Sequence, residues 1–183
     1  EVVKELSDQY LNWEHGAQSE IPKKIKTVNH LAKGAKIEAV TSLHKKYQNI
    51  EVLLDGKRGI PNYSSGQWIG QEAKDLEFLI DLGAVKSISE IKVGYLQSVG
   101  NWIFGPRALE LSFSTDGKKY GNKEVISGAK SWNQNNGLQM LKGEVKADSR
   151  FVKITINNIG KCPEGSSCEG GLAYFFIDEI IVQ

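Results

Sequence analysis

The sequence contains little that would support catalysis. Its 183 residues include only three histidines and two cysteines. It has no HExxH zinc motif, no GxSxG nucleophile motif, no Walker loop and no dinucleotide-binding glycine pattern. Carboxylates are plentiful, but no spacing in the sequence pairs two of them across a cleft, as glycoside hydrolysis requires. We therefore expect no catalytic residues and no enzyme activity in this chain.

The sequence also lacks an excess of either charge and any long apolar run. It has 23 Lys and Arg against 22 Asp and Glu, a net charge of +1. That balance argues against nucleic acid as a partner, because nucleic acid requires a basic surface. The basic stretch PKKIK at 22–26 indicates a solvated linker rather than a binding patch. No apolar run is long enough to span a bilayer, so we expect no membrane insertion.

Two regions of the chain differ in their sequence pattern. Hydrophobic residues make up 40% and charged residues 25% of the chain, as in ordinary globular domains. Residues 1–27 place apolar side chains near helical spacing, from Val3 to Trp13, and Gly16 is a plausible stop. We interpret this segment as a linker or the end of a preceding domain. Residues 28–183 are predicted to form one domain.

This domain is predicted to be all-β. Short apolar runs alternate with polar residues and are separated by turn residues, as in strands with one buried face. Asp116-Gly117 predicts a hairpin turn. Seven or more strands with no helical alternation favour a sandwich or barrel. The predicted strands are Ala35–Val40, Leu76–Leu82, Ile88–Gln97, Ala108–Ser114, Gly137–Ala147, Phe151–Ile159 and Leu172–Val182.

The loops between these strands combine aromatic rings with planar amides. Sugars present apolar CH faces that stack on such rings, and hydroxyl groups that bond to amides or charged forks. Trp68 precedes a strand and is better interpreted as a core residue, whereas Trp102 suits ligand contact and an interface equally well. The candidate ligand-binding residues are Tyr63, Gln97, Asn101, Trp102, Arg107 and Trp132.

Two long segments carry a resemblance to a known family. DGKRGIPNYSSGQWIGQEAKDLEFLIDL, at 55–82, and GGLAYFFIDEIIVQ, at 170–183, resemble the discoidin domain, also called the coagulation-factor 5/8 type C domain. The resemblance covers about 28–183. It implies a jelly-roll β-sandwich of the galactose-binding-domain type and a carbohydrate-binding module similar to those of family 32.

A narrower resemblance includes YLQSVGNWIFGPRALELSFSTDGKKY, at 95–120. Together with the two segments above, it is similar to the C-terminal module of Bacteroides-type, chitobiase-like β-N-acetylhexosaminidases. This implies a glycan partner of the N-acetylhexosamine or galactose type and a secreted, periplasmic or cell-surface parent with its catalytic domain upstream. The alternative is a structural domain that packs on the parent's catalytic barrel. Gln97 stands where galactose-type members carry Arg, so the sugar's identity does not transfer.

The resemblance further implies a structural calcium ion. Asp55 would supply a side-chain oxygen, Arg58 a backbone carbonyl and Glu179 an oxygen from the last strand, in keeping with calcium's preference for oxygen ligands. The insert between Asp55 and Trp68 is longer than the family pattern, and the Lys57-Arg58 pair would repel a cation. In the alternative, Asp55 caps a turn and Glu179 faces solvent.

The two cysteines, Cys162 and Cys168, lie in the short loop CPEGSSC. We predict that they form a disulfide, which requires an oxidising compartment. Because the closed loop is small, the bond would mainly fix the loop that leads into the last strand. The alternative is two free thiols.

Overall fold

The computed structural model describes residues 26–128, 132 and 136–183. Most of the predicted linker, residues 1–25, lies outside the described residues, so its boundary stays a prediction. The first described residues are already bonded to the domain. Thr27 pairs with Lys57, and the Val28 N–H donates to the Gly56 carbonyl over 2.8 Å.

The described residues form an antiparallel, seven-stranded structure with two short 3-10 turns. No helix among them is long and apolar enough to cross a membrane. The strands are β1 (Lys36–Ala39), β2 (Ile69–Glu72), β3 (Leu76–Gln97), β4 (Ala108–Ser114), β5 (Glu124–Ser127), β6 (Gly137–Asn157) and β7 (Tyr174–Val182), and the turns are η2 (Ile50–Leu54) and η3 (Val99–Asn101).

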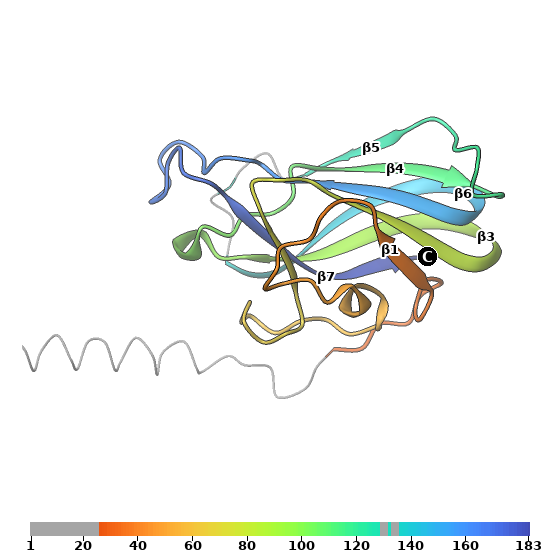
Figure 1. Cartoon of the computed structure of the whole chain (residues 1–183), viewed down its shortest axis with the longest axis horizontal. Helices are drawn as coiled ribbons and strands as arrows, with labels where there is room; N and C mark the ends of the chain where they lie inside the picture. Colours follow the sequence, from red (N-terminus) through yellow and green to blue (C-terminus); the bar gives the residue numbers. More distant parts are fainter. Residues whose placement is uncertain (1–25, 129–131, 133–135) are drawn as a thin grey trace, which may run out of the picture.

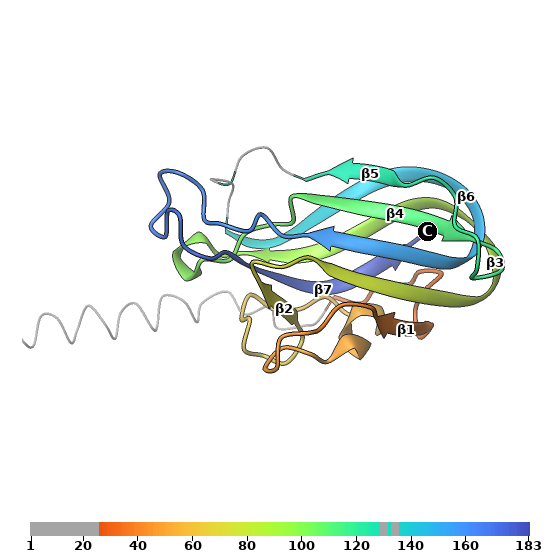
Figure 2. The same cartoon turned by 45° about the horizontal axis from the view of Figure 1, so that its top comes forward.

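Strands β3 and β6 are long enough to belong to both layers of a sandwich (Figures 1 and 2). The first part of β3, up to Asp81, pairs with β1 and with the last part of β6. The part from Lys86 onward pairs with the first part of β6, and from Ile91 also with β7. The register is irregular between Asp81 and Lys86, where the strand bends. The sequence predicted two strands in each of these segments, and the structure corrects this to one bent strand each.

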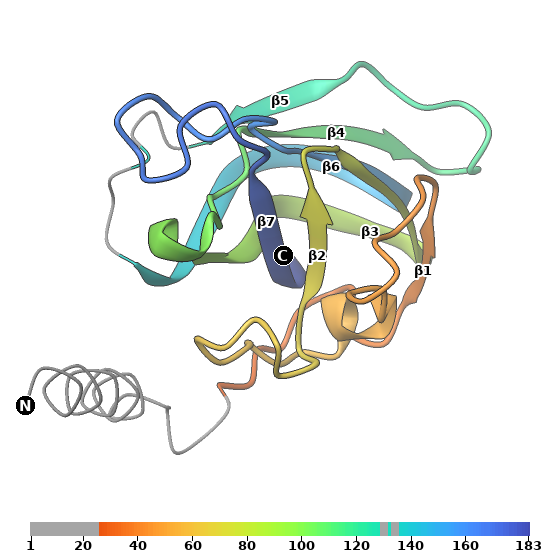
Figure 3. The same ribbon diagram turned by 60° about the vertical axis from the view of Figure 1, so that its left-hand side comes forward.

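The remaining pairings complete the two layers. β4 pairs with the last part of β6, and β5 pairs with β4. β2 pairs with β7 in the other layer (Figure 3). The connectivity confirms the predicted all-β sandwich.

Alternating side chains explain why the layers pack together. In β4, Leu109 and Leu111 are both 0% exposed, and Glu110 between them is not buried. One apolar cluster joins side chains from both halves of β3, including Phe78 and Val93, to Ile154 of β6. Burying one face of each layer against the other is the main stabilising contribution in such a sandwich.

Sequence reasoning located β4 at the correct residues but missed β2 and β5. Asp116-Gly117 does form a turn after β4, with Gly117 at φ 72°, a conformation that favours glycine. β5 begins only at Glu124, so the β4–β5 hairpin has a longer connection than the two-residue turn that was predicted.

Candidate functional site

Two adjacent carboxylates of β7, Asp178 and Glu179, are 0% exposed and bond to the loop that begins at Asp55-Gly56, which we call the Asp-Gly loop. Neighbouring side chains of a regular strand point to opposite faces. Here the register of β7 against β3 shifts between Gly94 and Tyr95, which makes Asp178 the extra residue of a β-bulge. A bulge redirects side chains, and as a result both carboxylates bond to the same loop.

Asp178 forms a buried ion pair with Arg58. The Arg58 Nε donates to Asp178 Oδ2 over 2.6 Å, and the Gly59 N–H donates to the same oxygen over 2.7 Å. The Arg58 Nη2 also donates to the Gln139 carbonyl over 3.0 Å. Burial raises the pKa of Asp178, and the Arg58 charge acts against this rise.

The pair requires a glycine on the neighbouring strand. A Cβ on Gly94 would lie 2.1 Å from Asp178 Oδ1 and 2.8 Å from Arg58 Nε. Asp178 Oδ1 has no hydrogen-bond partner among the described residues. The space beside Gly94 is therefore filled by this charged pair.

Glu179 is bonded on both of its oxygens. Oε1 lies 2.9 Å from His30 Nε2, and Oε2 accepts the Lys57 N–H over 2.9 Å. His30 Nδ1 accepts the Val182 N–H, which leaves the ring proton on Nε2 for Glu179. Burial raises the pKa of Glu179, and the hydrogen bond from His30 opposes this rise.

The residues predicted to bind calcium come together here, but their arrangement does not fit the ion. Glu179 accepts hydrogen bonds on both oxygens, and Asp55 Oδ1 accepts the Lys57 N–H over 2.8 Å. The Arg58 guanidinium lies beside Asp178. Within 26–128, 132 and 136–183, no three His, Cys, Asp or Glu residues form a group that could hold a metal. Calcium needs six or more oxygen ligands, and donors and cations surround these carboxylates.

Two of the predicted ligand-binding residues, Gln97 and Trp132, contact other residues within the protein. Gln97 is 4% exposed; its Nε2 donates to the Trp132 carbonyl over 2.7 Å, and its Oε1 accepts the Gly105 N–H over 3.0 Å. The Trp132 ring packs edge-on against Phe104, with ring centres 6.4 Å apart. Both the nitrogen and the oxygen of the Gln97 side-chain amide are therefore bonded within the protein.

Trp132 belongs to a small apolar cluster that contains the cysteines. Cys162 and Cys168 are bonded as a disulfide and are nearly buried, next to Phe104 and Ala173. Both cysteines lie in the loop that leads into β7. The disulfide thus fixes the start of the strand that carries the buried carboxylates.

Two further predicted residues, Trp102 and Arg107, are exposed but line neither of the aromatic hollows described below. Trp102 is 48% exposed and has a left-handed backbone, φ 62°. Its N–H donates to Val99 and its carbonyl accepts the Tyr174 N–H, so the backbone closes the η3 turn against β7. Arg107 joins its neighbours through its backbone, to Asn157 and Gly128.

The last two predicted residues, Tyr63 and Asn101, do come together. They line a hollow of about 320 Å³ beside the start of β7. Loops from before and after η2 and the η3 turn surround it, and these segments lie near β2 and β7 in Figure 3. The full lining is His44, Lys46, Tyr47, Tyr63, Asn101, Ile103, Tyr174 and Phe176.

The rings of this aromatic hollow contact one another. Phe176, which is 2% exposed, lies 4.8 Å from Tyr47, 5.3 Å from Tyr63 and 6.1 Å from Tyr174, measured between ring centres. His44 stacks on Tyr47 at 5.2 Å. The buried Phe176 thus supports partly exposed rings, which could present apolar faces to a ligand.

Polar groups surround these rings. A second hollow of about 120 Å³ shares Lys46, Tyr47 and Tyr63 with the first and adds polar lining from Gln48, Asn49 and Ser64. The Lys46 Nζ lies 5.3 Å from the Tyr47 ring centre. Rings flanked by amides, hydroxyls and one cation can stack on a sugar and bond to its hydroxyl groups.

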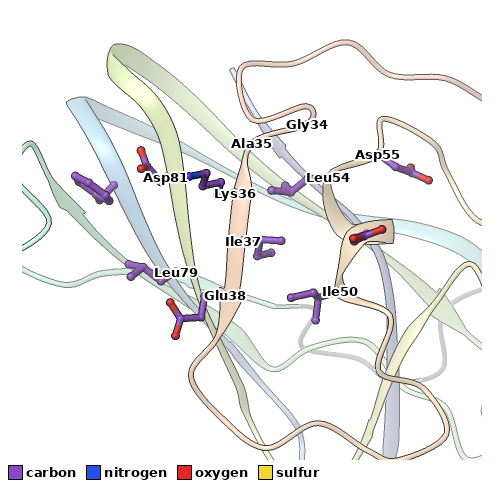
Figure 4. A pocket seen from close by; sticks show the side chains of 12 residues that line it. Gly34, Ala35, Lys36, Ile37, Glu38, Ile50, Leu54, Asp55, Leu79 and Asp81 are labelled. Atoms are coloured by element: carbon purple, nitrogen blue, oxygen red, sulfur yellow. The ribbon is translucent and has the colours of Figure 1, made fainter.

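A third hollow, of about 860 Å³, is larger than these two and has a different lining (Figure 4). It lies along β1, between η2 and β3. Ile37 of β1 points toward Ile50 and Leu54 of η2, while Lys36 points toward Asp81. Phe151 is its single aromatic residue, and acidic side chains are frequent. This aliphatic groove lacks the stacked rings that suit a sugar.

Sequence reasoning missed His44, Tyr47 and Tyr174 as site residues. HKKY at 44–47 combines two rings with two cations, which was a usable signal. Tyr174 and Phe176 are two residues apart on β7, so their side chains lie on the same face of the strand. Burial raises the pKa of Tyr174, and the neighbouring Glu72 carboxylate raises it further.

No protein-family model and no curated protein sequence matches the chain. Solved structures do match its fold. The lectin domain of lectinolysin, in complex with Lewis B antigen, has a TM-score of 0.55 at 14% identity, over 86% of this chain and 98% of that one. A fucose-binding module of Streptococcus pneumoniae also reaches 0.55, at 12% identity, over 85% and 94%.

Chitosan-binding module 1 of a chitosanase/glucanase from Paenibacillus sp. IK-5 gives a TM-score of 0.51 at 11% identity, over 85% of this chain and 98% of that one. These three domains all have a sandwich of the same type as the one described here. Identities this low show the fold alone, which agrees with the expected discoidin-like sandwich.

Proposed function

We propose that this chain is a non-catalytic carbohydrate-binding module and that the aromatic hollow is its glycan site. The observation that carries the proposal is the cluster of Tyr47, Tyr63, Tyr174 and Phe176 at a loop-lined edge of the sandwich. Tyrosine rings stack on the CH face of a sugar, and Asn101 offers a planar amide beside them. The solved neighbours include a fucose-binding and a chitosan-binding module, which supports this choice.

Catalysis is the weaker reading of this hollow. Glycoside hydrolysis usually requires two carboxyl groups on either side of the scissile bond. Among the described residues that line the two aromatic hollows, none is Asp or Glu. The hollow therefore suits binding rather than hydrolysis.

The proposal extends to the parent protein. We propose a secreted, periplasmic or cell-surface glycoside hydrolase resembling the β-N-acetylhexosaminidases, with its catalytic domain upstream. The disulfide between Cys162 and Cys168 is in keeping with an oxidising compartment. Affinity for one sugar should be weak, with a Kd near the millimolar scale, roughly −4 kcal/mol, because a shallow hollow makes few contacts. Tethering to a catalytic domain would raise the effective concentration at a polymer.

Isothermal titration tests the proposal. The whole chain is titrated with N-acetylglucosamine, N-acetylgalactosamine and galactose, together with the variants Tyr63→Ala and Tyr120→Ala. Tyr120 is a half-buried tyrosine that lines neither aromatic hollow, so it serves as the matched control. We expect binding that Tyr63→Ala abolishes and Tyr120→Ala preserves. Equal loss in both variants, or binding unchanged by Tyr63→Ala, would reject the hollow as the site.

A second function is favoured by one observation. Trp102 and Leu172 are each 48% exposed and lie outside the lining of the hollow. Exposed apolar side chains suit a structural domain that packs on its parent's catalytic barrel. This alternative predicts that the chain binds no glycan on an array. Binding that disappears in Tyr63→Ala but persists in Trp102→Ala would favour the module instead.

A further inference from the structure

The charged side chains that line the aromatic hollow have one sign. Lys46 and His44 are the basic residues in the described lining of the 320 Å³ and 120 Å³ hollows, and that lining contains no Asp or Glu. Lys45, next in sequence, is also exposed. We infer that the hollow recognises glycans that carry a negative charge, either a carboxylate or a sulfate. This inference rests on the proposed function and adds the class of sugar.

The position of Lys46 supports this choice. Its ammonium lies 5.3 Å from the centre of the Tyr47 ring, and its side chain is exposed. A sugar stacked on Tyr47 or Tyr63 would therefore place its ring substituents within reach of the ammonium. His44, stacked on the same Tyr47 ring, provides a second nitrogen donor at this edge.

Glu72 of β2 is paired with Tyr174 of β7, beside this lining. It lines neither hollow, and burial, followed by its carboxylate, raises the pKa of Tyr174. A neutral sugar offers many hydroxyl donors, for which carboxylates are strong acceptors. The lining supplies amide and hydroxyl acceptors but no carboxylate. An anionic substituent on the sugar would therefore add more binding free energy here than an additional hydroxyl group would.

The contrast with the aliphatic groove shows that the charge is segregated. The whole chain has a net charge of only +1. The groove along β1 nevertheless has Glu38, Glu51, Asp55 and Asp81 among its lining residues (Figure 4). Basic residues at one hollow and acidic residues at the other create local potentials that the overall balance conceals. The groove also contains Lys36, and Arg150 pairs with Asp81, so the contrast is one of degree: an anionic ligand would be favoured at the aromatic hollow over the groove.

The test compares matched ligand pairs by isothermal titration of the whole chain. One pair is 3′-sialyllactose and lactose, which differ by a carboxylated sugar. The other is N-acetylglucosamine 6-sulfate and N-acetylglucosamine, which differ by a sulfate. We expect the acidic member of at least one pair to bind about tenfold more tightly at low salt, with a smaller advantage at high salt because ions screen an exposed charge pair. The pair that shows the advantage identifies the source of the charge.

Variants place the effect at the hollow. Lys46→Gln should remove most of the acidic advantage and leave the affinity for the neutral member nearly unchanged, while Lys46→Arg should retain the advantage. Lys118→Gln, at an exposed lysine of the β4–β5 connection, is the control and should change neither affinity.

The outcomes separate this inference from the proposed function. Equal affinity for the acidic and neutral members of both pairs would overturn the inference and leave the carbohydrate-binding module intact. If the Lys46→Gln variant still binds the acidic sugar more tightly than the neutral one, the inference is also overturned, because another site would then recognise the charge. Absence of binding by all four sugars would overturn both.

Discussion

The buried charge pairs and the aromatic hollow both include residues of the connection between η2 and β2, yet they have opposite properties. Arg58 and Gly59 bond inward to Asp178, with no solvent access to that carboxylate. A few residues later, Tyr63 presents a partly exposed ring beside the hollow. Both regions contain residue types typical of ligand sites. Such side chains are structural where partners within the protein satisfy them, and are available for recognition where their faces stay exposed.

The strongest test of this comparison is to break the buried pair. Arg58→Ala leaves the Asp178 carboxylate buried without its cation, which should lower the free energy of unfolding by about 3–5 kcal/mol. Urea denaturation measures the change. Lys123→Ala, which breaks the more exposed pair with Glu110, is the control and should leave the midpoint almost unchanged. A similarly small effect for both variants would mean that the buried pair is not structural.

A second test fills the space that the pair occupies. Gly94→Ala would place a methyl group 2.1 Å from Asp178 Oδ1. We expect a loss of about 3 kcal/mol, the upper end of the usual range for overpacking. Gly100→Ala is the matched control, because nothing lies within 4 Å of its added Cβ. If thermal denaturation gives the same melting temperature for both variants, the space beside Gly94 is not tightly filled.

Removing the disulfide should have a smaller effect. The two cysteines are six residues apart, so the closed loop is short and contributes about 2 kcal/mol through the unfolded state. Cys162→Ser combined with Cys168→Ser should lower the unfolding free energy by that amount and leave glycan affinity intact, because the bond lies in the cluster of Phe104 and Trp132 and not in the aromatic hollow. Loss of glycan binding in a folded double variant would contradict the separation of the two regions.

Calcium should have the smallest effect of all. Because Glu179 is already bonded to His30 and to the Lys57 N–H, adding calcium or removing it with a chelator should not change the melting temperature. Differential scanning calorimetry in calcium and in chelator measures this. A rise of several degrees with calcium would show that the ion displaces these internal bonds and that the family's metal site is retained.

The predictable part of the fold was the part set by local alternation. Leu109 and Leu111 alternate with polar residues, and β4 forms there because one face is buried. β3 was predicted as two strands because the alternation fails between Asp81 and Lys86, where the strand bends. The four residues of β2 carry too little pattern to detect, and their pairing with β7 depends on the tertiary fold.

The site was predictable only in part for a similar reason. Tyr63 and Asn101, two of the candidate ligand-binding residues, lie together in the lining of the aromatic hollow. Gln97 has the same chemistry, but its amide is bonded on both sides within the protein, which no local pattern reveals. Tyr47 reaches the hollow through contact with Phe176, which is distant in sequence. Whether a polar or aromatic residue is satisfied internally is a property of the tertiary structure.

If the aromatic hollow binds the glycan and the buried charge region does not, a ¹H–¹⁵N chemical-shift titration of the whole chain with N-acetylglucosamine and galactose at millimolar concentrations should show it. We expect the amide signals of Tyr47, Tyr63 and Asn101 to shift in a saturable way and those of Arg58 and Gly59 to stay unchanged. Saturable shifts centred on the Asp-Gly loop or on the aliphatic groove, or no shifts with either sugar, would contradict this expectation.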